Sequence, residues 1–254
     1  MVAAKYIVGI VGNIVSVLIF ASPIPTFWRI VKRGSTEDFE GLPYVSTLLE
    51  AALWVYYGLT KPGAILIATV NIVGTVMELI YVILFIMYAP PRVRGKTVMW
   101  VAFLDVGFFG VTFLVTRFAM DGDFRISVLG FICAGLCIVM YGSPLSIMRT
   151  VITTKSVEYM PFLLSFVLFV NAAVWTTYSI LTKDLFVMVP NGLGFLLGLA
   201  QLILYAMYMN HKDAKSRVQG LEEGRQPLIQ PSEVHENGEV KNKIRSNYNT
   251  TRLP

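Results

Sequence analysis

The stretch Ser22–Glu37, SPIPTFWRIVKRGSTE, has a second copy at Ser143–Glu158, SPLSIMRTVITTKSVE, at an offset of 121 residues. The two copies align without a gap and share the Ser-Pro pair that opens each of them. Apolar segments resemble one another by chance, but a shared proline carries more weight, because proline removes a backbone hydrogen bond from a helix. The match therefore indicates an internal repeat.

The repeat continues downstream at the same offset. EAALWVYYGL, which begins at Glu50, lies over NAAVWTTYSI, which begins at Asn171. This alignment pairs Trp54 with Trp175, two of the four tryptophans in the chain. One residue is then lost in a loop, and further matches follow at an offset of 120 residues, including Asn71 with Asn191 and Gly74 with Gly194.

The composition places most of the chain in lipid. Of its 254 residues, 55% are hydrophobic and only 15% are charged, whereas soluble domains carry about 25% charged residues. A helix needs about 20 apolar residues to cross a bilayer. On that scale the chain has seven spans, near residues 6–30, 43–60, 64–88, 97–118, 126–150, 160–182 and 185–208. The net charge of +5 does not indicate nucleic-acid binding, because the basic residues lie beside the spans and in the polar C-terminal segment.

Seven spans and one repeat of three predict an all-α membrane protein. Three helices reverse the direction of the chain across the membrane, so the span at 97–118 is expected to invert it again and make the two triplets parallel. The expected architecture is 3 + 1 + 3, two parallel three-helix bundles joined by an inverting linker helix. We expect the first repeat at residues 1–90, the linker at 91–120, the second repeat at 121–210 and a disordered cytosolic tail at 211–254.

The distribution of Lys and Arg predicts the orientation in the membrane. Alternate connections carry ten basic residues on one side of the membrane and five on the other. The positive-inside rule then places the N-terminus outside, or in a lumen, and the C-terminal tail in the cytosol.

Asn71 and Asn191 are the leading candidates for substrate binding. A carboxamide in lipid is costly unless its donors and acceptors are satisfied, so such side chains usually face the interior of the bundle. Two asparagines across a pseudo-two-fold axis could hydrogen-bond to a neutral polyol. The indole rings of Trp54 and Trp175 could pack against the C–H face of a sugar ring. The alternatives are asparagines that only hold helices together and tryptophans of an interfacial belt. Tyr57 and Tyr178 fit such a belt better.

Further positions are expected to complete the pocket. Ser16 pairs with Cys137 and Ile19 pairs with Met140 in the repeat, close to the Ser-Pro motifs. Acids inside spans are candidate functional groups by default. Glu50 lies one helical turn from Trp54, and its repeat mate is Asn171, so both are assigned to the pocket. Two other intramembrane acids, Glu78 and Asp105, are read equally well as protonated structural groups.

Four prolines are predicted gate hinges near the cytosolic ends of spans: Pro23, Pro43, Pro144 and Pro161. For Pro43 and Pro161 the alternative is a helix start. No phosphate-binding loop, nucleophile elbow or His/Cys cluster occurs in the sequence. Cys133 and Cys137 lie on one helix face and have no distant partner. The sequence therefore predicts no enzymatic activity, no metal and no cofactor.

These residues resemble the SWEET sugar transporters, which have parallel repeats. The resemblance covers about residues 6–210, and its most specific stretches are GNIVSVLIFASPIPTFWRIVKRGSTEDFEGLPY, LWVYYG, MYGSPLSIMRTVITTKSVEYMPF and VPNGLG. It implies facilitative, bidirectional transport of mono- or disaccharides by alternating access, with the paired asparagines and tryptophans on the sugar and the four prolines at the gates. It also implies homo-oligomers in the bilayer.

The sequences of these motifs are most similar to those of the plant subgroup of the vacuolar membrane. This resemblance implies fructose or glucose as substrate and leaves open whether sucrose is also transported. The vacuolar membrane is favoured over the plasma membrane. Glu50 departs from the family pattern, in which many members carry a small or neutral polar residue. That departure leaves the shape of the pocket and any effect of pH open.

Two alternatives remain. The PQ-loop carriers of amino acids share the repeat plan, but their marker is a Pro-Gln pair, whereas the prolines here precede Ile24, Tyr44, Leu145 and Phe162. A seven-helix receptor lacks a matched repeat of three helices.

Overall fold

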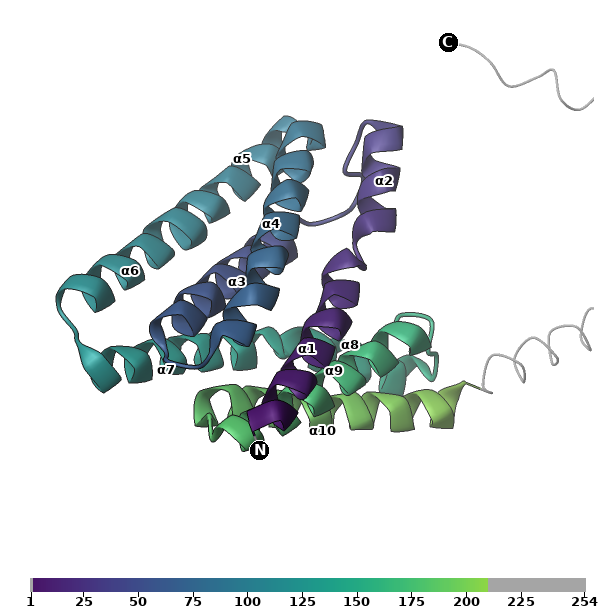
Figure 1. The fold of residues 1–254 in the computed structure, drawn as a ribbon. Helices are drawn as coiled ribbons and strands as arrows, with labels where there is room; N and C mark the ends of the chain where they lie inside the picture. Colours follow the sequence, from purple (N-terminus) through teal and green to yellow (C-terminus); the bar gives the residue numbers. More distant parts are fainter. Residues whose placement is uncertain (1, 210–254) are drawn as a thin grey trace, which may run out of the picture. The chain divides into compact units, whose positions relative to one another are not determined.

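Helices account for nearly all of residues 2–209, the part of the chain that the computed structural model describes (Figure 1). The predicted cytosolic tail at 211–254 lies outside these residues. The elements are α1 (Val2–Ala21), α2 (Ile24–Arg33), α3 (Leu42–Thr60), α4 (Ile65–Tyr88), α5 (Pro91–Trp100), η1 (Val101–Phe108), α6 (Phe109–Phe118), α7 (Gly122–Met140), α8 (Gly142–Thr154), α9 (Phe162–Thr182) and α10 (Leu185–Tyr208).

Each of the seven predicted spans corresponds to helix. Within residues 2–209, six helical segments are long and apolar enough to cross a membrane by length and composition: α1–α2, α4, α5–α6, α7–α8, α9 and α10. The remaining span, α3, is less hydropathic because it carries Glu50 and several hydroxyl-bearing side chains. It packs against α4, α7 and the linker helix, so less of its surface has to be compatible with lipid.

The contacts between helices arrange two triplets into a ring. In the first triplet α4 packs against both α1 and α3, and in the second α10 packs against both α7 and α9. The triplets meet where α1 contacts α9 and where α3 contacts α7. The linker, a continuous rod formed by α5, η1 and α6, packs mainly on α3 (Figure 1). This arrangement agrees with the predicted 3 + 1 + 3 architecture.

The repeated Ser-Pro pairs coincide with interruptions of the first helix in each triplet. The chain leaves α1 at Ala21 and enters α2 at Ile24, with Pro23 at the start of the new helix. In the second triplet α7 ends at Met140, and Pro144 lies in the first turn of α8. Proline cannot donate to the preceding turn, so both breaks fall where the backbone ladder is already interrupted.

The other two prolines begin helices. Pro43 is the second residue of α3 and Pro161 directly precedes α9. Both positions suit proline, because the first backbone N–H groups of a helix have no intrahelical acceptor. The hinge role of all four prolines stays a prediction.

Close packing of α3 on α4 depends on Gly58. A Cβ atom at this position would lie 2.6 Å from the backbone nitrogen of Ala68. Small residues let membrane helices approach each other in this way, because the association of such helices relies on close van der Waals contact. Gly110, in the linker helix, has open space around it instead.

Candidate functional site

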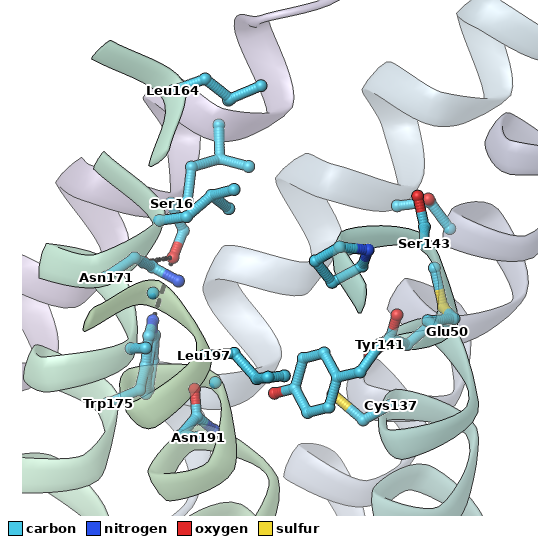
Figure 2. A pocket seen from close by; sticks show the side chains of 18 of the residues that line it. Ser16, Glu50, Cys137, Tyr141, Ser143, Leu164, Asn171, Trp175, Asn191 and Leu197 are labelled. Atoms are coloured by element: carbon cyan, nitrogen blue, oxygen red, sulfur yellow. Dashed lines mark hydrogen bonds between the residues drawn. The ribbon is translucent and has the colours of Figure 1, made fainter. Parts of the chain in front are cut away.

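A cavity of about 560 Å³ lies inside the ring of helices. Its lining comes from α1, α3, α4 and α7–α10, so both triplets contribute. The structure brings together all ten residues predicted for substrate binding: Ser16, Ile19, Glu50, Trp54, Asn71, Cys137, Met140, Asn171, Trp175 and Asn191. Figure 2 labels six of them: Ser16, Glu50, Cys137, Asn171, Trp175 and Asn191. Of the predicted hinges, Pro144 and Pro161 line the cavity.

Asn71 and Asn191 have equivalent environments on α4 and α10. Each side-chain Nδ2 donates to the backbone carbonyl four residues earlier, at 2.8 Å, to Ile67 from Asn71 and to Val187 from Asn191. Within residues 2–209 no protein donor reaches the Oδ1 of either asparagine, and both residues line the cavity, so this oxygen and the second N–H are available to a ligand. An arrangement that only held helices together would use these groups between helices.

One polar triad joins α1 to α9. The Ser16 hydroxyl donates to Asn171 Oδ1 at 2.6 Å, and Trp175 Nε1 donates to the Ser16 hydroxyl at 2.9 Å (Figure 2). These bonds connect the first helix of one triplet to the second helix of the other. The triad therefore fixes both the indole ring and the junction between the triplets.

The repeat mates of these three residues form a second triad between α3 and α7. The thiol of Cys137 and the indole N–H of Trp54 lie near the carboxyl group of Glu50, as potential hydrogen-bond donors to it. Figure 2 shows Glu50 and Cys137 across the cavity from Ser16 and Asn171. The two triads thus match in position and differ in chemistry, because one contains a carboxamide and the other an acid.

The aromatic residues of α3 and α9 are buried. Trp54 and Trp175 are 7% and 6% exposed, so they do not belong to an interfacial belt. Each packs edge-on against the tyrosine three residues later, with ring centroids 5.3 Å apart for Trp54–Tyr57 and 5.2 Å for Trp175–Tyr178. The belt prediction for Tyr57 and Tyr178 is wrong, because both side chains lie in the core.

Tyr57 belongs to a sealed end of the cavity. Its hydroxyl donates to both carboxylate oxygens of Asp184, at 2.9 and 3.0 Å, and Lys61 Nζ lies 2.7 Å from Asp184 Oδ2. Asp184 is 2% exposed and also accepts from the backbone N–H of Phe186. Since Tyr57 and Lys61 come from α3 and Asp184 precedes α10, this cluster ties the first triplet to the second.

The opposite end of the cavity reaches the surface near Pro144 and Pro161. Its lining there includes Tyr159, which is 64% exposed, and Leu164. In this conformation the cavity extends to the exposed residues of the proline end, and the buried Tyr57–Asp184 pair joins the triplets beyond its other end. A carrier in one of its two access states has this geometry.

Tyr141 is a cavity residue that sequence reasoning missed. Its hydroxyl donates to the backbone carbonyl of Pro190 at 2.5 Å and thereby ties α7 to α10. A Cβ atom at Gly194 would lie 2.7 Å from this hydroxyl oxygen, so the glycine makes room for the ring. The repeat mates Phe20 and Gly74 are arranged in the same way. Extending the repeat alignment to Phe20 and Tyr141 would have identified the pair.

Two predicted functional acids lie outside the cavity lining. Glu78 is 4% exposed, and its Oε2 has no hydrogen-bond partner within residues 2–209. Asp105 lies in η1, a π-helical stretch of the linker. Both of its carboxylate oxygens are also buried without a hydrogen-bond partner within residues 2–209. The structure thus separates both acids from Glu50.

A charged cluster follows α2 at the proline end. Glu37 pairs with Arg29, at 2.5 Å, and with Arg33. Desolvation raises the pKa of the Glu37 carboxyl, but the hydrogen bonds and charges of Arg33 and Arg29 outweigh this effect, so the pKa lies below its ordinary value of 4.5. The cluster holds the loop after α2 against that helix.

The described residues contain no group of three or more His, Cys, Asp or Glu side chains suited to a metal ion. Cys133 and Cys137 are both free thiols. The site thus offers neutral polar groups, two indoles and one acid.

Comparison with known proteins assigns the chain to a family. A family model described as "Sugar efflux transporter for intercellular exchange" matches residues 6–93 and 127–213. The bidirectional sugar transporter SWEET17 of Arabidopsis thaliana is 50% identical, over 92% of this chain and 95% of its own length. The chain belongs to the SWEET family. The two matched segments of this SWEET chain leave out most of the linker helix, as expected for a repeat of three helices.

Two further SWEET proteins support the same family assignment. The bidirectional sugar transporter SWEET16 of Arabidopsis thaliana is 48% identical over 90% of this chain and all of its own length. A eukaryotic SWEET transporter solved at 3.7 Å resolution matches with a TM-score of 0.79 and 39% identity, over 82% of this chain and 98% of that chain. The predicted family and 3 + 1 + 3 fold are confirmed, and this SWEET chain is a multi-pass membrane protein. A PQ-loop carrier or a receptor is not favoured.

Proposed function

We propose that this protein is a facilitative, bidirectional sugar carrier that works by alternating access, with hexoses such as fructose and glucose as its substrates. The observation that carries the proposal is the cavity between the triplets, lined by matched residues of both repeats. Membership of the SWEET family supports the same function. A catalytic function is not proposed.

The lining suits a neutral polyhydroxylated ring. Asn71 and Asn191 each offer a side-chain oxygen and a second N–H, which can exchange hydrogen bonds with hydroxyls. Trp54 and Trp175 provide flat apolar surface for the C–H face of a sugar. A cavity of about 560 Å³ falls within the usual range for small-molecule sites, about 300–1,000 Å³. Disaccharides remain a second candidate class.

The two ends of the cavity provide the gates. Opening of the Asp184 end requires the Tyr57–Asp184 hydrogen bonds to separate, because they join the two triplets. Closure of the other end brings together the segments around Pro23, Pro43, Pro144 and Pro161. The helix breaks at Pro23 and Pro144 allow α2 and α8 to move relative to α1 and α7.

The charge distribution and the resemblance support a specific placement. We infer that the proline end and the tail face the cytosol, and that the N-terminus and Asp184 face the lumen or the exterior. The vacuolar membrane is the proposed location, and a homo-oligomer is the proposed assembly. The proposed functional units are residues 1–90, 91–120 and 121–210.

The test is uptake of radiolabelled hexose in cells that lack their own hexose carriers. The full-length protein should equilibrate the sugar, and Asn71→Ala or Asn191→Ala should raise the half-saturating concentration about three- to tenfold, the worth of one hydrogen bond. Asn13→Ala is a matched control, because Asn13 lies outside the cavity lining and its amide bonds Gly9, Leu66 and Thr69. That variant should change the amount of folded carrier and leave the half-saturating concentration alone. An unchanged half-saturating concentration in both Asn71→Ala and Asn191→Ala would refute the proposed site.

A further inference from the structure

The two triads differ in charge, because only one of them contains an acid. Asn171 and Glu50 occupy equivalent positions in the repeats, and Asn171 accepts a hydrogen bond from Ser16 of α1. Asn171 can only be neutral, whereas Glu50 is the one Asp or Glu of residues 2–209 that lines the cavity. The acid sits about one helical turn from Trp54, at the depth where the sugar is proposed to bind.

Within residues 2–209 the protein supplies no cation to this carboxyl group. No Lys, Arg or His of this part of the chain lines the cavity. The titratable groups around Glu50 are Cys133 and Cys137 on α7 and Tyr141 between α7 and α8, all uncharged in their ordinary forms. Lys61, at the sealed end, is already paired with Asp184. An ionised Glu50 therefore has only hydrogen-bond donors as partners.

Those donors leave part of the carboxyl group free. A carboxylate has about four acceptor positions, and the two nearby donors, Cys137 and Trp54, can fill only part of them. Glu50 also lines a cavity large enough for a ligand. A ligand that brings both N–H donors and a positive charge satisfies this group better than a hydroxyl does, because charge-assisted hydrogen bonds are about twice as strong as neutral ones.

We propose that the carrier also transports hexosamines, sugars in which a protonated amine replaces one hydroxyl, with Glu50 as the residue that recognises the ammonium group. This inference rests on the proposed sugar-carrier function and extends it to a cationic class of substrate. The ammonium group stabilises the carboxylate form of Glu50, since an opposite charge within a few ångströms favours the charged form. Between protein surfaces of lower dielectric constant the attraction is stronger than in bulk water.

The same arrangement works against anionic sugars. A uronate or a sugar phosphate would enter a cavity that has an acid and no basic side chain, so its charge would be desolvated without a partner. An N-acetylated hexosamine has lost the positive charge and should behave as a bulky neutral sugar. We therefore expect the affinity to be highest for a hexosamine, lower for a hexose and lowest for a uronate.

The experiment uses the purified full-length protein in proteoliposomes at about pH 6, where a sugar amine is protonated. Labelled glucosamine and labelled glucose are taken up in parallel, and the readout is the ratio of their half-saturating concentrations. In the unsubstituted protein the ratio should favour glucosamine. In Glu50→Gln, which keeps the size of the side chain and removes its charge, the ratio should shift against glucosamine by about tenfold or more.

Two further variants separate charge from shape. Asn171→Ala changes the repeat mate of Glu50 without changing the charge of the cavity, so the ratio should stay as in the unsubstituted protein. The double variant Glu50→Gln/Asn171→Asp moves the acid to the other triad and should restore preference for glucosamine. Where a variant is folded but transports too slowly, equilibrium binding of the two labelled sugars in detergent gives the same ratio.

Several outcomes overturn the inference. An equal ratio in Glu50→Gln and in the unsubstituted protein would mean that Glu50 acts as a neutral group. Glucose uptake without any glucosamine uptake or binding would have the same meaning. If instead the unsubstituted protein moves neither sugar, the proposed carrier function itself has failed, which is a different result.

Discussion

The Tyr57–Asp184 link predicts that Tyr57→Phe favours the state open at the Asp184 end. The substitution keeps the ring and removes one hydroxyl that donates to a buried carboxylate at 2.9 and 3.0 Å. A hydrogen bond to a charged group contributes about 1.5–3 kcal/mol. Lys61 remains 2.7 Å from Asp184 and keeps the carboxylate paired, so we take the lower end of this range. A loss of about 1.5 kcal/mol shifts the equilibrium between the access states roughly tenfold.

The assay is the labelling rate of an introduced cysteine. Ile67 is 3% exposed and lines both the main cavity and the small pocket beside Asp184. In a background without the two native thiols, Ile67→Cys is exposed to a membrane-impermeant thiol reagent added only from the Asp184 side. Because Ile67 is only 3% exposed in this conformation, labelling from this side should be slow until this end opens, and Tyr57→Phe should raise the labelling rate about tenfold.

The repeat provides the control. Tyr178 is the mate of Tyr57, is equally buried, and makes no hydrogen bond to Asp184 within residues 2–209. Tyr178→Phe is therefore the same chemical change without the loss of the link, and labelling should remain close to that of the unsubstituted background. Equal labelling rates in the two tyrosine variants would refute the assignment of the Tyr57–Asp184 pair as the gate.

Three other substitutions test separate parts of the structure. Ser16→Ala leaves Trp175 without its hydrogen-bond acceptor, so the half-saturating sugar concentration should rise about tenfold in uptake assays; an unchanged value would count against the triad. Gly58→Ala should destabilise the protein by about 1–3 kcal/mol through overpacking, whereas Gly110→Ala should not, and equal melting temperatures would contradict the packing. For Glu37→Gln, the lowered pKa means that Glu37 stabilises the protein above about pH 4.5 and that the contribution disappears as the pH falls through the folded-state pKa. The difference in melting temperature should be constant from about pH 5 to 7 and vanish in more acidic solution, and a difference that grows on acidification would exclude this account.

The fold could be predicted from the sequence because both of its signals are strong. Apolar runs of membrane length leave few choices for the spans, and the repeat of Trp54 and Asn71 at Trp175 and Asn191 shows which spans are equivalent. A pseudo-two-fold axis brings equivalent positions towards each other. For that reason the ten predicted binding residues line one cavity, although their separations along the chain are large.

The sealed end of the cavity could not be predicted in the same way. Tyr57 resembled an interfacial tyrosine, because its depth along the span is known from the sequence but its neighbour on the other triplet is not. Lys61 and Asp184 lie in short connections, where charged residues normally report only topology. The contact between α3 and the α9–α10 connection depends on how the triplets pack, and no periodicity along the chain contains that information.

The linker helix shows a related limit. Its span was predicted from hydropathy, but nothing in the composition indicates that Val101–Phe108 is π-helical. Such a stretch depends on packing against neighbouring helices, in this case α3. The buried carboxyl group of Asp105 is therefore a feature that only the three-dimensional structure places.

Counterflow in proteoliposomes tests the central claim most directly. Vesicles loaded with unlabelled glucose are diluted into a trace of labelled glucose with no ion gradient. A carrier whose single cavity is exposed alternately to each side should accumulate label transiently and then release it as the unlabelled gradient decays, and Asn71→Ala/Asn191→Ala should reduce this overshoot. Label that rises only to its equilibrium level would contradict alternating access, and label that stays above equilibrium under an imposed proton gradient would contradict facilitative transport.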